Sequence, residues 1–320
     1  MKQASTAWQE RIPPDEAAHF ARVAEVIARL QQAKSAKFGK GRALHRKQLL
    51  AATGTLEVLS DLPDHARHGL FARPGIHRAL VRLSNGGPDV QANRVPDIRG
   101  FALKVLDVSG DSALGGYTDH QDFLMINQDR TPTRDSREFI DFIEAATPGP
   151  LAGILHLFKA HGPFGGFARL RDLFATLGRK FNGFAAERFN TVVPLCCGPY
   201  AVRVRLKPSG SPPPTQRSKD IVLDLRERLA AGPVTWDLEL QFFVDEPTTP
   251  IEDASKAWPD SETPIVTVAR LTLPRQGVDD VAAEAEAAKF DPWSGLMAHR
   301  PLGEVMRARK VAYLASQKGR

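Results

Sequence analysis

The chain has 320 residues, of which 42% are hydrophobic and 25% charged, and this globular composition excludes a disordered protein. Its formal net charge of +6 raises the question of an anionic partner. Cys196 and Cys197 are adjacent, which excludes a disulfide framework and a cysteine zinc site. No run of eighteen apolar residues exists and residues 1–11 lack the apolar core of a secretory signal, so we expect no membrane span and a cytoplasmic location.

The first predicted element is a helix. Pro13-Pro14-Asp15 is typical of a helix start, and apolar residues recur at helical spacing to about Leu30. Residues 34–46 are polar and include two glycines, which predicts an extended arm. Period-two alternation then predicts strands at residues 55–58, 79–84, 101–105, 200–206, 236–242 and 266–273. The continuous apolar run from Phe123 to Ile126 predicts a strand that is buried on both sides.

Helical patterns separate the early strands from the late ones. They cover residues 136–146, 153–177 and 278–288, and a final helix opens at Pro301. A loop rich in serine, proline and glycine covers residues 209–214. Because the alternation of a doubly wound sheet is missing, the order favours an antiparallel α+β fold that includes a barrel. We expect one domain over residues 1–320, with residues 1–40 forming an N-terminal helix and arm.

The positive charge is concentrated in two segments. Residues 29–48 contain seven basic residues and no acidic one, and residues 297–320 contain six basic residues and only Glu304. Solvated basic faces are the ordinary explanation of such runs. Nucleic-acid binding is a second explanation, but aromatic residues are not interleaved with the cations as a stacking platform requires. A small anionic ligand held between the two segments is the third.

The final helix contains a chemically specific pair. Arg309 and Tyr313 are four residues apart and so lie on one helix face, and Arg320 returns near that face seven residues later. A guanidinium beside a phenol stabilises the phenolate, because a nearby positive charge favours the charged form. A tyrosinate is the axial iron ligand in some haem proteins. Taken alone, this spacing is also compatible with an ordinary surface helix.

Arg309-Lys-Val-Ala-Tyr313, followed by Arg320, resembles the proximal haem motif of the haem catalases. The resemblance implies that Tyr313 is the fifth ligand of the iron, that Arg309 keeps it ionised and that Arg320 contacts a haem propionate. The segments 291–296 and 299–303 resemble the approach to this helix in the small catalase-related proteins. That group includes minimal bacterial peroxidases and the haem domain of coral allene oxide synthase.

A second motif in the basic arm resembles the distal side of the same family. Arg42-Ala-Leu-His45 is similar to the catalase Arg-x-x-His, which implies that His45 is the distal acid/base and that Arg42 reaches a propionate. Histidine suits this role because its ordinary pKa lies near neutrality. The segment 81–84 resembles the strand whose arginine also contacts a propionate, which implicates Arg82.

The middle of the chain adds further similarity to the family. Residues 97–104 resemble the family's Asp-Pro-Arg-Gly-Phe-Ala segment and are interpreted as structural support, while residues 121–127 resemble its next strand. Near the start of that strand catalases have an asparagine that helps to bind peroxide. Here the candidates are Asp119 and His120, and the sequence leaves the choice between them open. This departure weakens the expectation of full catalase activity.

The resemblance implies a catalase-like antiparallel β-barrel with flanking α-helices and a C-terminal helix that binds haem b. It implies a homo-oligomeric enzyme that reduces hydrogen peroxide or organic hydroperoxides through a high-valent oxo-iron intermediate, with a small organic electron donor, and peroxidase activity is favoured over catalase activity. Two alternatives are a fatty-acid hydroperoxide isomerase or dehydratase similar to allene oxide synthase, and a non-enzymatic haem carrier or sensor. Nucleic acid is not an expected partner, because the basic segments are the ones that contain the haem motifs.

Overall fold

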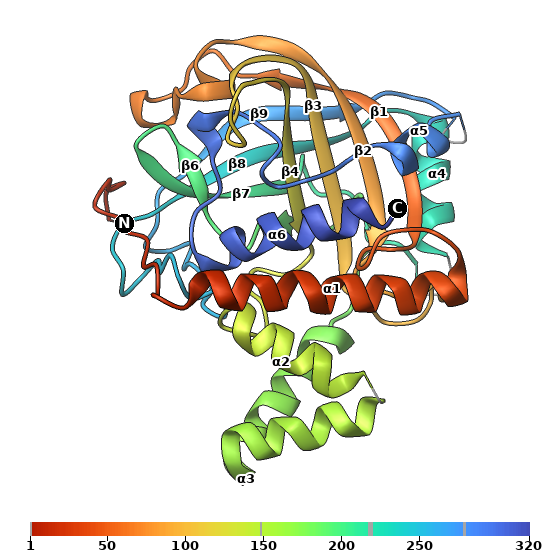
Figure 1. Cartoon of the computed structure of the whole chain (residues 1–320). Helices are drawn as coiled ribbons and strands as arrows, with labels where there is room; N and C mark the ends of the chain where they lie inside the picture. Colours follow the sequence, from red (N-terminus) through yellow and green to blue (C-terminus); the bar gives the residue numbers. More distant parts are fainter. Residues whose placement is uncertain (1, 148, 217–219, 278–279) are drawn as a thin grey trace.

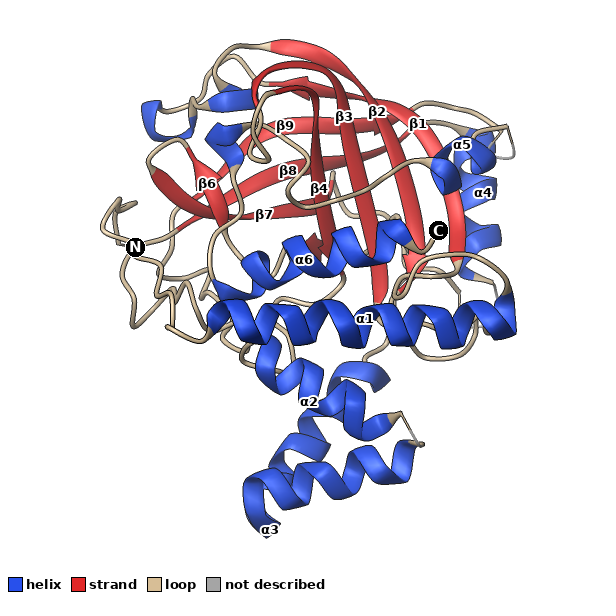
Figure 2. Ribbon diagram, viewed as in Figure 1, coloured by secondary structure: helices blue, strands red, loops and turns tan. Residues whose placement is uncertain are grey.

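A computed structural model describes residues 2–147, 149–216, 220–277 and 280–320. Within these ranges the central feature is an antiparallel sheet that closes into a barrel (Figures 1 and 2). Its strands are β1 (Gln48–Val58), β2 (Gly75–Asn85), β3 (Arg99–Asp111), β4 (Tyr117–Ile126), β5 (Phe189–Asn190), β6 (Leu195–Cys197), β7 (Tyr200–Pro208), β8 (Val234–Phe242) and β9 (Ile265–Leu273). The predicted antiparallel α+β barrel is confirmed.

The strand order explains the closure. The sheet runs β5-β4-β3-β2-β1-β9-β8-β7-β6, and β5 pairs with both β4 and β7, so eight strands form a ring and β6 extends it beside β7. Closure leaves the ring without free edges. Alternate residues of each strand fill the interior, which is why the period-two patterns identified most of the strands.

Helices cover the outside of the barrel and extend beyond it. They are α1 (Glu16–Phe38), α2 (Ser136–Ala146), α3 (Pro150–Gly178), α4 (Ile221–Ala231), α5 (Ala282–Ala287) and α6 (Glu304–Lys318). Short 3₁₀ turns occur at Asp64–Ala66, Gly69–Phe71 and Met297–His299. α1 and α6 lie side by side along one flank of the barrel, whereas α2 and α3 project from it (Figure 1). None of the helices within the described ranges has the length and apolar character needed to cross a membrane.

Two sequence expectations about helix ends are wrong. The arm predicted over residues 34–46 is helical as far as Phe38, where Gly39 ends α1 with φ of 81°, a left-handed conformation that glycine adopts at little cost. The last helix begins at Glu304 and not at Pro301, because Gly303 before it has φ of 85°. α4, β5 and β6 were not expected at all, since short elements have weak periodicity.

Three other expectations are refined. The run from Phe123 to Ile126 is not uniformly buried: Phe123 and Met125 point into the barrel, while Leu124 and Ile126 lie on its partly exposed outer face. The stretch 153–177 belongs to one helical segment that is kinked at Gly162. Of the helix expected over residues 278–288, residues 278 and 279 lie outside the described residues, and α5 covers only its later part.

Candidate functional site

The candidate site is built on the outer face of the barrel wall. In β2, Val81 and Leu83 point into the barrel core, so alternation turns Arg82 and Ser84 outward. β3 continues this face, because Gly100 is the partner of Ser84 in the antiparallel ladder. Arg82 and Ser84 are nevertheless buried, because Glu286 of α5 contacts Arg82 and His45 contacts Ser84.

His45 lies on this wall in the segment between α1 and β1. Its φ is 49°, in the left-handed region that non-glycine residues rarely adopt, and its backbone N–H donates to the carbonyl of Gly86 at 3.0 Å. The ring Nδ1 is 3.0 Å from the hydroxyl oxygen of Ser84. A Cβ atom added at Gly100 would lie 2.5 Å from that Nδ1, so the ring requires glycine there.

The electrostatic environment keeps His45 neutral. Burial of the imidazole, together with the positive charges of Arg82, Arg309 and Arg42, lowers its pKa to about 3. A neutral imidazole is the form that accepts a proton. If the ring proton lies on Nδ1 and is donated to Ser84, Nε2 is the accepting atom.

α6 presents the second half of the site. Arg309 donates from Nη2 to the Tyr313 hydroxyl at 3.1 Å, and its guanidinium carbon lies 5.3 Å from the centre of the tyrosine ring. The helix is held in place by Arg307, which pairs with Glu10 and Glu16. The Arg309–Tyr313 pair predicted from the spacing therefore exists.

Three further arginines meet around one glutamate. Arg42 and Arg82 both form ion pairs with Glu286 of α5, and Arg320 donates to the Glu286 backbone carbonyl at 2.5 Å. Arg42 also donates to the carbonyls of Glu286 and Ala288. Burial together with the neighbouring Arg82 lowers the pKa of Arg42 to about 9, although Glu286 opposes this shift. Three guanidinium groups thus gather at Glu286, and only two of them pair with its carboxylate, which leaves a local excess of positive charge.

These groups form a single site. The positive charges of Arg42 and Arg82 act on one another and on Arg320, and Tyr313 interacts electrostatically with both Arg42 and Arg82. Arg309 in turn acts on His45. Six of the eight residues singled out in the sequence thus come together from segments nearly 300 positions apart. They are Arg42, His45, Arg82, Arg309, Tyr313 and Arg320.

Asp119 and His120, the other two predicted site residues, lie away from this site. The Asp119 side chain is 93% exposed and contacts His120, whose Nδ1 is 2.7 Å from the aspartate oxygen. Alternation puts only His120 on the outer face of β4, six residues from Ile126, the partner of Gly100. Six residues of strand span about 20 Å. The structure therefore does not bring either candidate to His45, because Leu124 and Asp122 lie between on the same face.

A buried polar group beside the site was missed from the sequence. Lys104 pairs with Asp122 at 2.6 Å across β3 and β4, and the other oxygen of Asp122 accepts from the backbone N–H of Asp291. Gln317, one turn after Tyr313, donates to the Asp291 carboxylate at 2.9 Å. This network connects the barrel wall to α6. Glu286 was missed too, and its only sequence signal was the acidic character of the segment 278–288.

The residues present fit a haem. Two propionates would neutralise the excess charge of the arginine cluster, and guanidinium groups bind carboxylates in bidentate geometry. Tyr313, next to Arg309, is the residue that would ligate the iron, while His45 would face it from the barrel wall. No group of histidine, cysteine, aspartate or glutamate side chains suited to a metal ion occurs in the described ranges.

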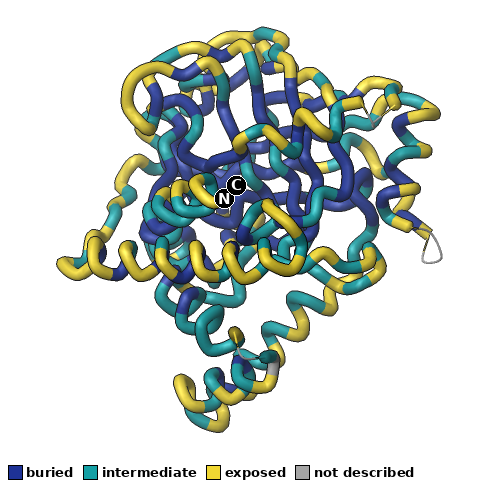
Figure 3. Tube along the Cα trace, turned by 45° about the vertical axis from the view of Figure 1, so that its right-hand side comes forward, coloured by how far each residue is buried: buried dark blue, intermediate teal, exposed yellow. Residues whose placement is uncertain are grey.

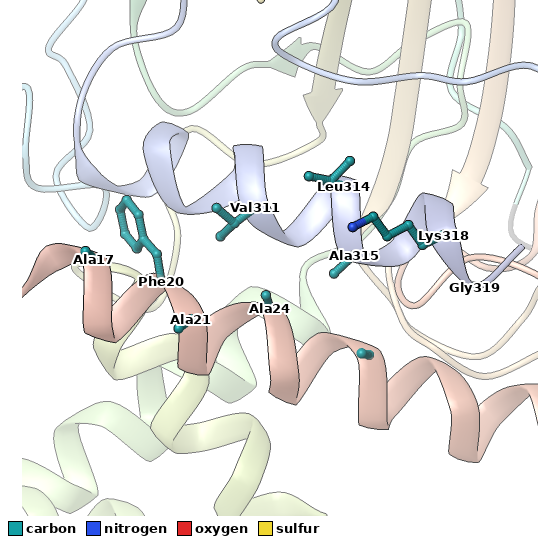
Figure 4. A pocket seen from close by; sticks show the side chains of 10 residues that line it. Ala17, Phe20, Ala21, Ala24, Val311, Leu314, Ala315, Lys318 and Gly319 are labelled. Carbon is teal, nitrogen blue, oxygen red and sulfur yellow. The ribbon is translucent and has the colours of Figure 1, made fainter.

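A groove elsewhere on the same helix is separate from this site. It lies between α1 and α6, has a volume of about 690 Å³ and is lined mainly by alanine and other apolar residues (Figure 4). Phe20, Val311 and Leu314 are among its lining residues, and none of the eight predicted site residues is. The groove therefore does not alter the assignment of the site.

Comparison with known proteins finds similarity to catalases in sequence and in fold. No family model matches the chain. The catalase of Capsicum annuum is 25% identical over 272 residues, covering 76% of this chain and 52% of that protein, and Catalase-2 of Caenorhabditis elegans is 25% identical over 315 residues, covering 89% and 57%. A fungal catalase structure superposes with a TM-score of 0.70 at 20% identity, covering 100% of this chain and 65% of that one.

The fold is that of the catalases, an antiparallel barrel flanked by helices. The chain therefore has the catalase fold and is similar in sequence to catalases over 76–89% of its length. The chain spans about half the length of the curated catalases it matches.

Proposed function

We propose that this protein is a haem-dependent enzyme that reduces hydrogen peroxide or organic hydroperoxides, with a small organic molecule as electron donor. The observation that carries the proposal is the meeting of His45, Tyr313 with Arg309, and the three clustered arginines at one place on the barrel wall. The proposed cofactor is haem b, and the proposed subgroup is that of the small catalase-related peroxidases. A cytoplasmic location, and a homo-oligomeric state that the resemblance implies, complete the proposal.

Each residue has a defined task in this reaction. Arg42, Arg82 and Arg320 bind and orient the propionates, and Arg309 donates to the Tyr313 hydroxyl oxygen, which favours the ionised ligand. Bound haem would supply the ferric iron at which a peroxide is reduced. His45 would accept a proton on Nε2 from one peroxide oxygen and pass it to the other, so that this second oxygen can depart as water, or as an alcohol from an organic hydroperoxide, when the O–O bond breaks. Positioned proton transfer of this kind contributes about 10²–10⁴-fold to a rate.

Peroxidase activity is favoured over catalase activity. Catalases have an asparagine near the start of the strand that corresponds to β4, whereas here Asp119 is exposed to solvent and His120 is separated from His45. His45 and Ser84 are then the polar side chains that act on a peroxide, and neither Asp119 nor His120 takes the place of the catalase asparagine. We propose that a second peroxide is therefore a poorer reductant for this enzyme than an organic donor.

The test is the absorption spectrum of the haem-loaded protein before and after addition of peroxide. Tyr313→Phe should abolish or grossly alter the haem spectrum, while Tyr117→Phe, at an exposed tyrosine of β4, is the matched control and should leave it unchanged. An unaltered spectrum in Tyr313→Phe would overturn the ligand assignment. His45→Asn should keep the bound haem but slow the spectral change with peroxide by about 10²-fold or more.

The products distinguish the candidate activities. Oxygen evolution without a donor indicates catalase activity, and donor-dependent consumption of peroxide indicates peroxidase activity. Rearrangement of a lipid hydroperoxide without any reductant would instead indicate an isomerase or dehydratase. A haem spectrum that does not respond to peroxide in the unaltered protein would contradict the proposed enzyme and favour a haem carrier.

A further inference from the structure

The projecting helix α3 exposes an unusual number of large apolar side chains. Phe164 is 91% exposed, and Phe167, Phe174, Leu151 and Leu155 are each at least 60% exposed. No other phenylalanine of the described residues is exposed to this degree. α3 packs chiefly against α2, away from the barrel, as Figures 1 and 3 show. Clustered apolar exposure of this kind marks an interaction surface, whereas isolated exposed residues do not.

The three phenylalanines belong to one helix face. Phe164, Phe167, Arg171 and Phe174 follow one another at spacings of three, four and three residues, which places them in one stripe. We call these four residues the phenylalanine stripe. An ordinary surface helix turns its apolar stripe towards the core and its polar face towards water. In α3 the apolar stripe faces water instead.

Contacts on the rest of the helix fix this orientation. Arg169 pairs with Glu138 of α2, and Asp172 pairs with Arg130 in the segment before α2. These ion pairs turn two charged side chains of α3 towards the rest of the molecule. Rotating the helix to bury the phenylalanine stripe would break both of them.

The two halves of α3, on either side of its kink, pack against one another. Gly162 has φ of 70° and is followed by Pro163, so the chain reverses there into a second helical half. A Cβ atom added at Gly166 would lie 2.7 Å from the Cα of Phe158, which shows that the two halves pack closely at that point. The exposed phenylalanines are therefore held on a packed scaffold.

The charge around the stripe is positive. Between residues 149 and 180 there are five basic residues and a single acidic one, Asp172, which is already paired. Lys159, Arg171 and Lys180 are exposed and form no ion pair with any residue in the described ranges. Aromatic side chains flanked by free cations are the combination that binds the interface of an anionic lipid bilayer.

We propose that the phenylalanine stripe docks the protein on anionic phospholipid membranes, with the phenyl rings in the acyl boundary and Lys159 and Arg171 at the headgroup phosphates. This inference is independent of the proposed peroxide chemistry. A second copy of the chain is disfavoured as the occupant, because a symmetric contact centred on the stripe would bring Arg171 against its own counterpart. A lipid surface offers the opposite charge.

The experiment is vesicle flotation of the full chain. We expect the protein to float with vesicles of phosphatidylcholine mixed with phosphatidylserine and to float poorly with phosphatidylcholine alone. The triple variant Phe164→Ser, Phe167→Ser and Phe174→Ser should lose binding. Its matched control is Ile76→Ser with Leu114→Ser, which removes exposed apolar side chains from the barrel and its turns and should bind normally.

The charge contribution is tested separately. Replacing Lys159 and Arg171 with glutamine should weaken binding to the mixed vesicles by about 30-fold, the combined effect of two cations near an anionic surface. Absence of flotation with the mixed vesicles, or equal binding by the triple variant, would overturn the proposal. Sedimentation velocity tests whether a second copy of the chain occupies the stripe instead. If the unaltered protein self-associates, the triple variant does not, and neither binds vesicles, the stripe joins two copies and the proposal is overturned.

Discussion

Acidification should destabilise the haem-free protein through His45. The folded state holds the pKa of His45 at about 3, whereas the ordinary value is 6.5. Between these values the unfolded chain binds a proton that the folded protein does not, so the free energy of unfolding falls as the pH falls. The loss is about 1.4 kcal/mol for each pH unit below 6.5, and it amounts to about 2 kcal/mol at about pH 5. This contribution to stability is fully present above pH 6.5.

Denaturant unfolding of the unaltered protein and of His45→Asn isolates this effect. Asparagine tolerates the left-handed backbone of position 45 and does not titrate. His19, His65 and His299 also have lowered pKa values, but they are common to both proteins and cancel in the comparison. The variant should gain about 2 kcal/mol relative to the unaltered protein between about pH 8 and about pH 5. Parallel pH profiles would refute the assignment of a neutral, buried His45.

Three further substitutions test other parts of the site. Asp122→Asn leaves Lys104 without its buried partner and should lower the free energy of unfolding by about 3–5 kcal/mol in a thermal or denaturant melt; a loss no larger than that of an exposed ion pair would contradict this. Gly100→Ala puts a methyl group against the His45 ring, so it should slow the reaction with peroxide and cost about 1–3 kcal/mol of stability, whereas unchanged kinetics would show that the ring does not need this contact. Glu286→Gln removes the carboxylate shared by two arginines and should destabilise the haem-free protein by about 1 kcal/mol, since the carboxylate is 43% exposed. Added haem should diminish that loss because propionates supply the missing charge, and equal losses with and without haem would argue against propionates at this cluster.

Local sequence patterns were sufficient to predict much of the fold. The alternation of Val81, Leu83, Phe101 and Leu103 identified strands of the barrel, because each strand buries one face in the interior. The spacing of Arg309 and Tyr313 was sufficient for the contact between them, since residues four apart on a helix are neighbours whatever surrounds them. Helix ends were less predictable, because the left-handed backbone at Gly303 and Gly39 is a local choice that glycine permits but does not require.

Contacts between residues distant in sequence could not be predicted from such patterns. Glu286 and Asp122 have no motif of their own, and their importance comes from partners that the closed barrel and α6 place against them. The choice between Asp119 and His120 also depended on the register of β4, because one residue of shift reverses the face of every side chain. The exposure of the phenylalanine stripe is similar: its spacing is that of a buried helix face, and only the ion pairs of α3 turn it outward.

The sequence by itself determined the class of fold, the alternation of the strands and the residue types of the candidate site, because these depend on short-range periodicity and on motifs. The tertiary structure decided which of those residues meet. It placed Arg42, Arg82 and Arg320 around Glu286, made His45 neutral by burial beside like charges and left Asp119 in solvent. The physical reason is that desolvation and charge interactions depend on distances in space, which separation along the chain does not specify.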